Sequence, residues 1–158
     1  MKALIAVYVL AMVTANLLVW WIGPWASPFI AFVLIGLDLT LRDVMHDRLS
    51  RWQMLAVVLV GGFITWVLNP SAAHIAIASA TAFTMSACVD WAVYTWLRDR
   101  PWHVRVNGSN AAAAAVDSVI FPTLAFGSFL PHIVALQFAA KVCGGAIWAL
   151  LVRRFATV

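Results

Sequence analysis

The residues of this chain that could do chemistry are ionisable side chains inside long apolar runs. Asp117 lies about two helical turns into such a run, which opens after Arg105 with an Asn107-Gly108 turn and Ser109, a good helix N-cap. An aspartate deep in a membrane helix costs ~2.5–3.5 kcal/mol on insertion scales. Asp117 therefore indicates a functional site that needs a polar or charged partner.

A second pair of polar residues lies on the last apolar run of the chain. Gln137 and Lys141 are four residues apart, so they share one face of a helix at mid-membrane depth. Nothing on that helix neutralises Lys141. Its partner must come from another helix, and Asp117, Asp90 and Asp38 are the candidates.

The second apolar run carries the most polar residues. Asp38 and Arg42 are four residues apart, and they could form a self-neutralised pair that only lets the helix insert. Asp43 points elsewhere on this helix and needs another partner.

For the whole polar set there is a structural alternative, in which buried ion pairs only hold the bundle together. Desolvation offsets most of the Coulomb gain of such pairs, which favours a binding pocket instead.

The types of side chain also indicate a type of ligand. Carboxylates accept from paired N–H groups, amides both donate and accept, lysine donates to a carbonyl oxygen, and aromatic rings stack. A guanine-like heterocycle presents all of these features, but an amino acid or a sugar fits the same set. The predicted substrate-binding residues are Asn16, Asp38, Arg42, Asp43, Asp90, Asn107, Asn110, Asp117, Gln137 and Lys141.

The elements that position these residues are transmembrane helices. Hydrophobic residues make up 65% of the 158 residues and charged residues 10%, against about 25% charged in soluble domains. The chain is predicted to be an all-α, polytopic membrane protein with a single transmembrane domain over residues 1–158. The apolar runs predict six spans, at about residues 3–22, 29–46, 52–68, 74–96, 109–129 and 132–151.

The distribution of positive charge gives the orientation. Of the ten Lys and Arg residues, only Lys141 lies well inside a span, and the first, third and fifth loops carry none. The positive-inside rule therefore predicts that both termini are cytoplasmic. The net charge of +4 belongs to these loops and does not indicate nucleic acid binding.

Catalytic, metal and cofactor sites are not indicated. Ser109, Ser118 and His132 form no nucleophile motif, so an enzyme is not expected. Cys88 and Cys143 lie in apolar runs and are predicted to be buried free thiols, neither a disulfide nor a metal pair.

The segments Arg105 to Ser109, Val116 to Phe121 and Gln137 to Lys141 carry motifs that resemble those of a known family, the VUT family of vitamin uptake transporters. The longest matches its Arg-x-Asn-x-Ser...Val-Asp-Thr/Ser-x-Ile-Phe...Ala-Phe pattern without gaps. The matching segments are Arg105 to Ser109, Val116 to Phe121, Ala125-Phe126, Gln137 to Lys141, Ala78-Ser79 with Asp90, and Ala15-Asn16. The chain departs from the family in the second span, where Asp38 and Asp43 are five residues apart instead of four. It also has Ala87 where members often carry Gln.

The resemblance implies a transporter of the bacterial inner membrane. Characterised bacterial members of the family import queuosine precursors such as 7-cyano-7-deazaguanine. The implied partners are such a small-molecule substrate and the membrane lipid, and a homodimer is expected because six spans are few for alternating access. Two other roles stay open: a substrate-capture subunit that needs an energising partner, and a structural membrane protein.

In the transporter hypothesis the polar residues divide between two edges of the ligand. Asp117, Asp90 and either Asp38 or Asp43 would hold its N–H edge. The residues expected to contact its carbonyl and remaining donors are Asn16, Asn110, Gln137 and Lys141. The helix terminus led by Ser109 could add its dipole.

Overall fold

The computed structural model describes residues 1–46 and 49–156, and within these ranges the chain is helical without a strand. The elements are α1 (Lys2–Ile22), α2 (Ser27–Ile30), α3 (Gly36–His46), α4 (Arg51–Leu68), α5 (Ala73–Trp96), α6 (Trp102–Phe126) and α7 (Pro131–Ala156), with a π-helical turn at Ala31–Ile35 and short 3₁₀ turns at Pro24–Ala26 and Pro70–Ala72. Since α2, the π turn and α3 are continuous, the described chain forms six helical segments. This confirms the all-α prediction.

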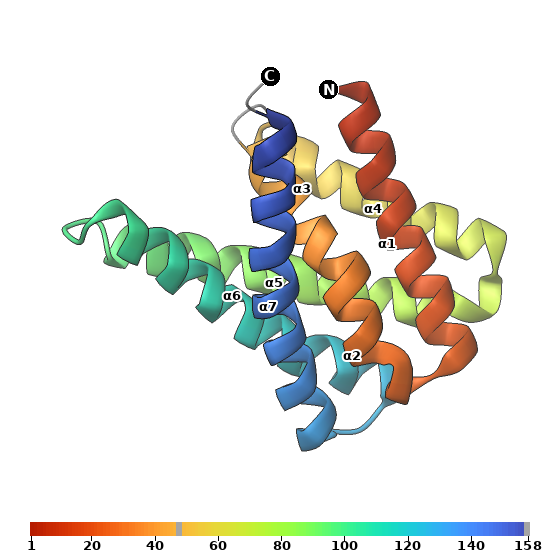
Figure 1. Ribbon diagram of the computed structural model, residues 1–158. Helices are drawn as coiled ribbons and strands as arrows, with labels where there is room; N and C mark the ends of the chain where they lie inside the picture. Colours follow the sequence, from red (N-terminus) through yellow and green to blue (C-terminus); the bar gives the residue numbers. More distant parts are fainter. Residues whose placement is uncertain (47–48, 157–158) are drawn as a thin grey trace.

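The outer surface of the molecule is apolar. Large side chains such as Trp21 (75% exposed) and Trp52 (80% exposed) point outwards, as expected for a surface that meets lipid and its interface. Three described helical stretches are long and apolar enough to cross a membrane, Lys2–Ile22, Pro70–Trp96 and Asn107–Phe126, and two shorter apolar stretches are Pro24–Asp38 and Trp52–Leu68. The start of α1 and the end of α7 lie at the same end of the molecule, as the predicted topology requires (Figure 1).

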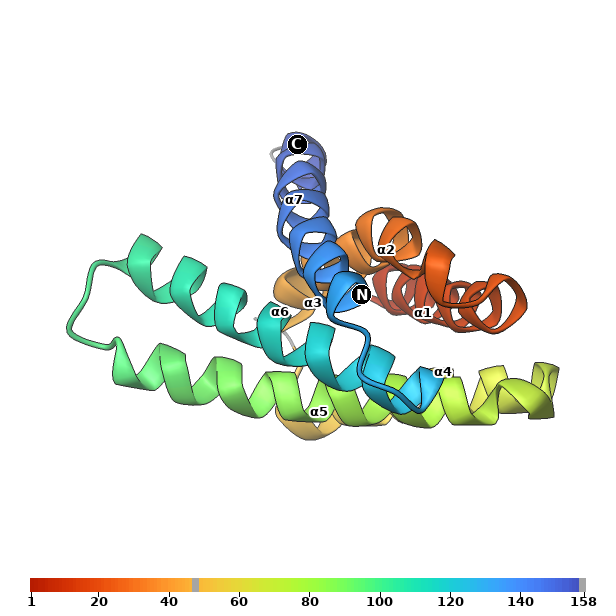
Figure 2. The ribbon, with the colours of Figure 1, turned by 90° about the horizontal axis from the view of Figure 1, so that it is seen from below.

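The helices pack in two groups that meet at the centre. α5 and α6 form a long antiparallel hairpin that runs across α7, and the tip of this hairpin extends away from the other helices (Figures 1 and 2). α1 packs on α3 and α4 through a cluster that includes Tyr8, Met45 and Val58. A second apolar cluster, which includes Val19 and Ile75, joins α1 to α2, α5 and α6.

The contact between the π turn and α7 is unusually close. A Cβ added to Gly144 would lie 2.3 Å from the backbone oxygen of Phe32, and one added to Gly36 would lie 2.7 Å from the backbone of Gly144. The indole N–H of Trp148 donates to the carbonyl oxygen of Val33 at 2.9 Å. Small residues let helix backbones approach in this way within a membrane, and the approach sets the position of α7 relative to α3.

We expect replacement of Trp148 by phenylalanine to lower stability modestly. The phenyl ring keeps most of the packing but removes the donor to Val33, which is worth about 1 kcal/mol. Thermal unfolding in detergent, followed by tryptophan fluorescence, should show a melting temperature lower than that of the wild type. The exposed Trp52, replaced in the same way, is the control and should leave it unchanged. Equal behaviour of the two variants would contradict the role assigned to the indole.

The start of α6 differs from the sequence prediction. The helix begins at Trp102, so Asn107 and Gly108 lie inside it and do not form a turn. A Cβ added to Gly108 would lie 2.9 Å from a methyl group of Leu97, so this glycine permits close packing at the hairpin tip. Ser109 is buried within the helix, so the predicted N-cap and the helix-terminus dipole at Ser109 are wrong.

The helix of α7 continues to Ala156, past residue 151 where its membrane span is predicted to end. One smaller prediction needs correction. Cys88 and Cys143 are free thiols as predicted, but both are exposed on the outside of the helices. Their position in apolar runs reflects a surface that faces lipid instead of the protein core.

Candidate functional site

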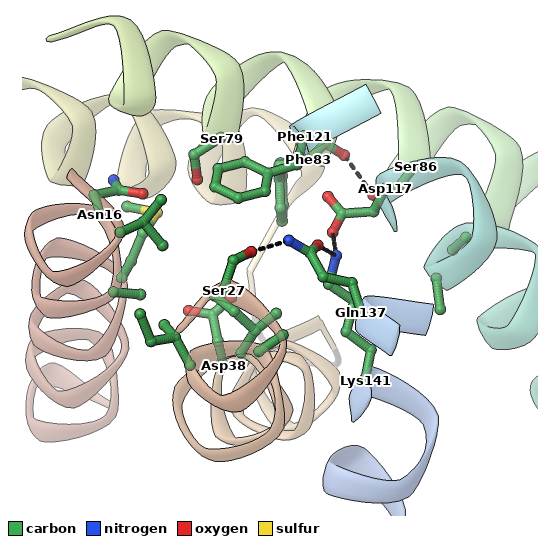
Figure 3. Close-up of a pocket in the computed structure, with 18 of the residues that line it drawn as sticks. Asn16, Ser27, Asp38, Ser79, Phe83, Ser86, Asp117, Phe121, Gln137 and Lys141 are labelled. Atoms are coloured by element: carbon green, nitrogen blue, oxygen red, sulfur yellow. Dashed lines mark hydrogen bonds and ion pairs between the residues drawn. The ribbon is translucent and has the colours of Figure 1, made fainter. Parts of the chain in front are cut away.

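A polar cavity lies at the centre of the molecule, where α1, the α2–α3 segment, α5, α6 and α7 meet (Figure 3). Counted as the space open to the centres of water molecules, it measures about 60 Å³, which is room for about four to six waters. Its polar lining residues are Tyr8, Asn16, Ser27, Asp38, Ser79, Ser86, Asp117, Gln137 and Lys141. This polar lining stands in contrast to the apolar outer surface.

An ion pair between α6 and α7 forms one wall of the cavity. Lys141 Nζ lies 2.5 Å from Asp117 Oδ2, and the side chains of Lys141 and Asp117 are 2% and 22% exposed. The ammonium group also donates to Gln137 Oε1 at 2.9 Å and to Ser118 Oγ at 3.3 Å. Asp117 therefore neutralises Lys141, as one of the three predicted pairings requires.

Gln137 extends this wall towards α2. Its amide oxygen accepts from Lys141, and its amide nitrogen donates to the hydroxyl of Ser27 at the start of α2. The side chains of Asp117, Lys141, Gln137 and Ser27 thus form a continuous chain of hydrogen bonds, which we call the polar relay (Figure 3). The relay connects α6, α7 and α2, and three of its side chains, those of Lys141, Gln137 and Ser27, are buried.

On the wall across the cavity from the ion pair, the polar groups make fewer hydrogen bonds within the protein. Asn16 of α1 donates from its amide nitrogen to Thr65 Oγ1 at 3.4 Å, which leaves its amide oxygen without a hydrogen bond among the described residues. Ser79 of α5 also lines the cavity on this side (Figure 3). Between the two walls lie the rings of Phe83 and Phe121, which offer flat apolar surface.

The structure brings together part of the predicted site. The predicted residues that line the cavity are Asn16, Asp38, Asp117, Gln137 and Lys141. Asp90, Asn107 and Asn110 do not line it, because they lie closer to the hairpin tip than the lining segments of α5 and α6. The side chains of Arg42 and Asp43 lie outside the described residues, although their backbone is part of α3.

Sequence reasoning missed the hydroxyl groups of the cavity. Ser27 precedes the second predicted span of residues 29–46, whereas it is buried at the first residue of α2 and accepts from Gln137. Ser86 is also buried and donates to the backbone oxygen of Phe83. A serine costs little in an apolar helix and therefore gives a much weaker signal than an aspartate.

Comparison with known proteins identifies the family. A sequence model of the family described as putative vitamin uptake transporter matches residues 2–154. A search of curated proteins found no match, and a search of solved structures found none either. Because the family match spans nearly the whole chain, and because the helices and their apolar exterior suit a multi-pass membrane protein, this chain belongs to the VUT family of vitamin uptake transporters.

Proposed function

We propose that this protein imports a 7-deazapurine, such as the queuosine precursor 7-cyano-7-deazaguanine, or a related nucleobase across the bacterial inner membrane. The ligand binds in the central cavity between α1, α2, α5, α6 and α7. The observation that carries this proposal is the lining of the cavity, which combines a carboxylate, amides and hydroxyls with two phenyl rings inside an apolar bundle.

The chemistry of the lining matches a planar base with an N–H edge. Asp117 uses Oδ2 to bind Lys141, and as a carboxylate it has further acceptor sites for the N1–H and 2-amino groups of a guanine-like ring. Asn16 accepts at the other side of the cavity, and Phe83 and Phe121 provide surface for stacking. A sugar has no flat π face to use those rings, so the lining favours a heterocycle.

Transport follows if the ligand binds two packings of the bundle with different affinity. Residues that face the cavity come from helices on both sides of it, so any separation of α1 and α2 from α6 and α7 changes the site. Asp90, Asn107 and Asn110 lie outside the cavity in this arrangement. We assign them no ligand contact in this packing.

A ligand screen tests the proposal. The purified protein in detergent is heated with 7-cyano-7-deazaguanine, guanine, adenine and a panel of vitamins, and its melting temperature is followed by tryptophan fluorescence. We expect 7-cyano-7-deazaguanine to raise the melting temperature most, because a ligand that binds only the folded state stabilises it by mass action. Stabilisation by none of the heterocycles would contradict the proposal.

Uptake into proteoliposomes separates transport from capture. Vesicles that contain this chain alone should accumulate labelled 7-cyano-7-deazaguanine, while protein-free vesicles should not. Binding without uptake, together with uptake that depends on an added ATPase complex, would identify a capture subunit instead. Neither binding nor uptake would identify a structural protein.

A further inference from the structure

The hydrogen bonds of the polar relay suggest that Lys141 and Asp117 have different roles in the cavity. We propose that Lys141 is a positioning residue, which fixes Asp117 towards the ligand and does not itself bind the ligand. This inference rests on the proposed function, because it assigns roles within that binding site. It replaces the sequence-based expectation that Lys141 donates to a carbonyl group of the ligand.

The hydrogen bonds of Lys141 are already complete. An ammonium group has three N–H donors, and Lys141 Nζ donates to Asp117, Gln137 and Ser118 at 2.5, 2.9 and 3.3 Å. Although Lys141 lines the cavity, its side chain is only 2% exposed. A ligand carbonyl could reach this ammonium only by breaking a bond with one of these buried partners, and that partner would then be left unsatisfied.

Gln137 is held in one orientation for the same reason. Its oxygen accepts from Lys141, so its NH₂ group must point towards Ser27, and it donates there. The amide is 1% exposed and is bonded at both ends. Gln137 therefore anchors Lys141 through its amide oxygen, and it uses one of its two N–H groups to hold Ser27.

All four members of the relay line the cavity, and Asp117 is the one whose side chain is most exposed. Only Oδ2 binds Lys141, and the side chain is 22% exposed although its partner is nearly fully buried. With one oxygen held at 2.5 Å, the other has a fixed direction before the ligand arrives. Such preorganisation lowers the cost of ordering the site on binding. The ligand group that Asp117 recognises must be a donor, and in a guanine-like base this is the amino-substituted edge.

Two ligands that differ in one amino group test this role. They are 7-cyano-7-deazaguanine and 7-cyano-7-deazahypoxanthine, which lacks the 2-amino group but keeps the carbonyl. Loss of a hydrogen bond to a carboxylate costs about 1.5–3 kcal/mol, so the wild type should prefer the first ligand by about 10- to 150-fold. In Lys141→Gln the carboxylate loses its anchor and its counter-charge, so this preference should fall to about 1- to 3-fold. In Asp117→Asn the preference for the first ligand should fall to the same extent.

The ratio of the two affinities distinguishes positioning from the other possible roles. If Lys141 binds the carbonyl group, Lys141→Gln weakens both ligands equally and the preference stays at its wild-type value. A purely structural role would also weaken both equally. The control is Asn16→Ala, which lies across the cavity and should weaken both ligands with an unchanged ratio. A preserved ratio in Lys141→Gln overturns the positioning role alone, whereas a wild type that binds neither ligand overturns the proposed function as well.

Discussion

Replacement of Gly144 by alanine will destabilise the folded protein strongly. The new methyl group would lie 2.3 Å from the carbonyl oxygen of Phe32, a backbone atom that cannot rotate away. α7 and the π turn must therefore separate, with the loss of the bond from Trp148 to Val33. Overpacking of this kind costs about 1–3 kcal/mol, and the broken contact places the effect at the upper end. The measurement is the melting temperature in detergent.

The neighbouring Gly145 supplies a matched control. A Cβ at Gly145 meets no atom within 4 Å, so Gly145→Ala has the same chemistry in the same helix without the clash. Alanine is favoured over glycine in a helix interior by about 0.5–1 kcal/mol, so this variant should be as stable as the wild type or slightly more stable. If the two variants have the same melting temperature, the close approach of α7 to the π turn is not what holds these helices in place.

Hydropathy was sufficient to predict the helices because the membrane imposes a simple rule. Every backbone group in the bilayer must be paired within a helix, so apolar runs of about 20 residues become helices whatever their tertiary contacts. α1, α4 and α5 begin and end within one residue or so of their predicted limits. The start of α6 was missed because the Asn107-Gly108 turn signal is local, whereas Gly108 is needed for packing against Leu97.

The site was predictable only where a charge made burial expensive. Lys141 needs a counter-ion at mid-membrane depth, which limited its partner to a few aspartates, and Asp117 is that partner. Asp90 satisfied the same rule but lies nearer the hairpin tip, because spacing along one helix does not give its depth in the bundle. The hydrogen bond between Ser27 and Gln137 depends on where the α2 segment meets α7, and this tertiary contact is not visible in the sequence. Hydrogen-bond partners across helices could not be read from single-helix periodicity.

Replacing only one partner of the ion pair between Asp117 and Lys141 will lower the stability of the protein far more than replacing both partners together. Asp117→Asn leaves the ammonium of Lys141 buried without a counter-ion, and Lys141→Met leaves the carboxylate of Asp117 facing methionine. An uncompensated charge of this kind typically destabilises by about 3–5 kcal/mol. The double variant Asp117→Asn/Lys141→Met is neutral at this site and should recover most of the lost stability, which thermal unfolding of all three variants would measure.

An exposed ion pair is the control for these stability measurements, and ligand binding shows whether the buried pair has a role beyond stability. Arg98 and Asp99 form an exposed pair at 3.9 Å, and Arg98→Ala should leave the melting temperature unchanged because such pairs contribute little. Single variants as stable as the wild type would mean that the pair is not buried in the folded protein. The double variant then separates packing from recognition. A pair that serves only to hold the helices together can be replaced by neutral residues without loss of binding. A pair that presents a carboxylate to the ligand cannot, so the double variant should fold and yet lose its preference for the amino-substituted base.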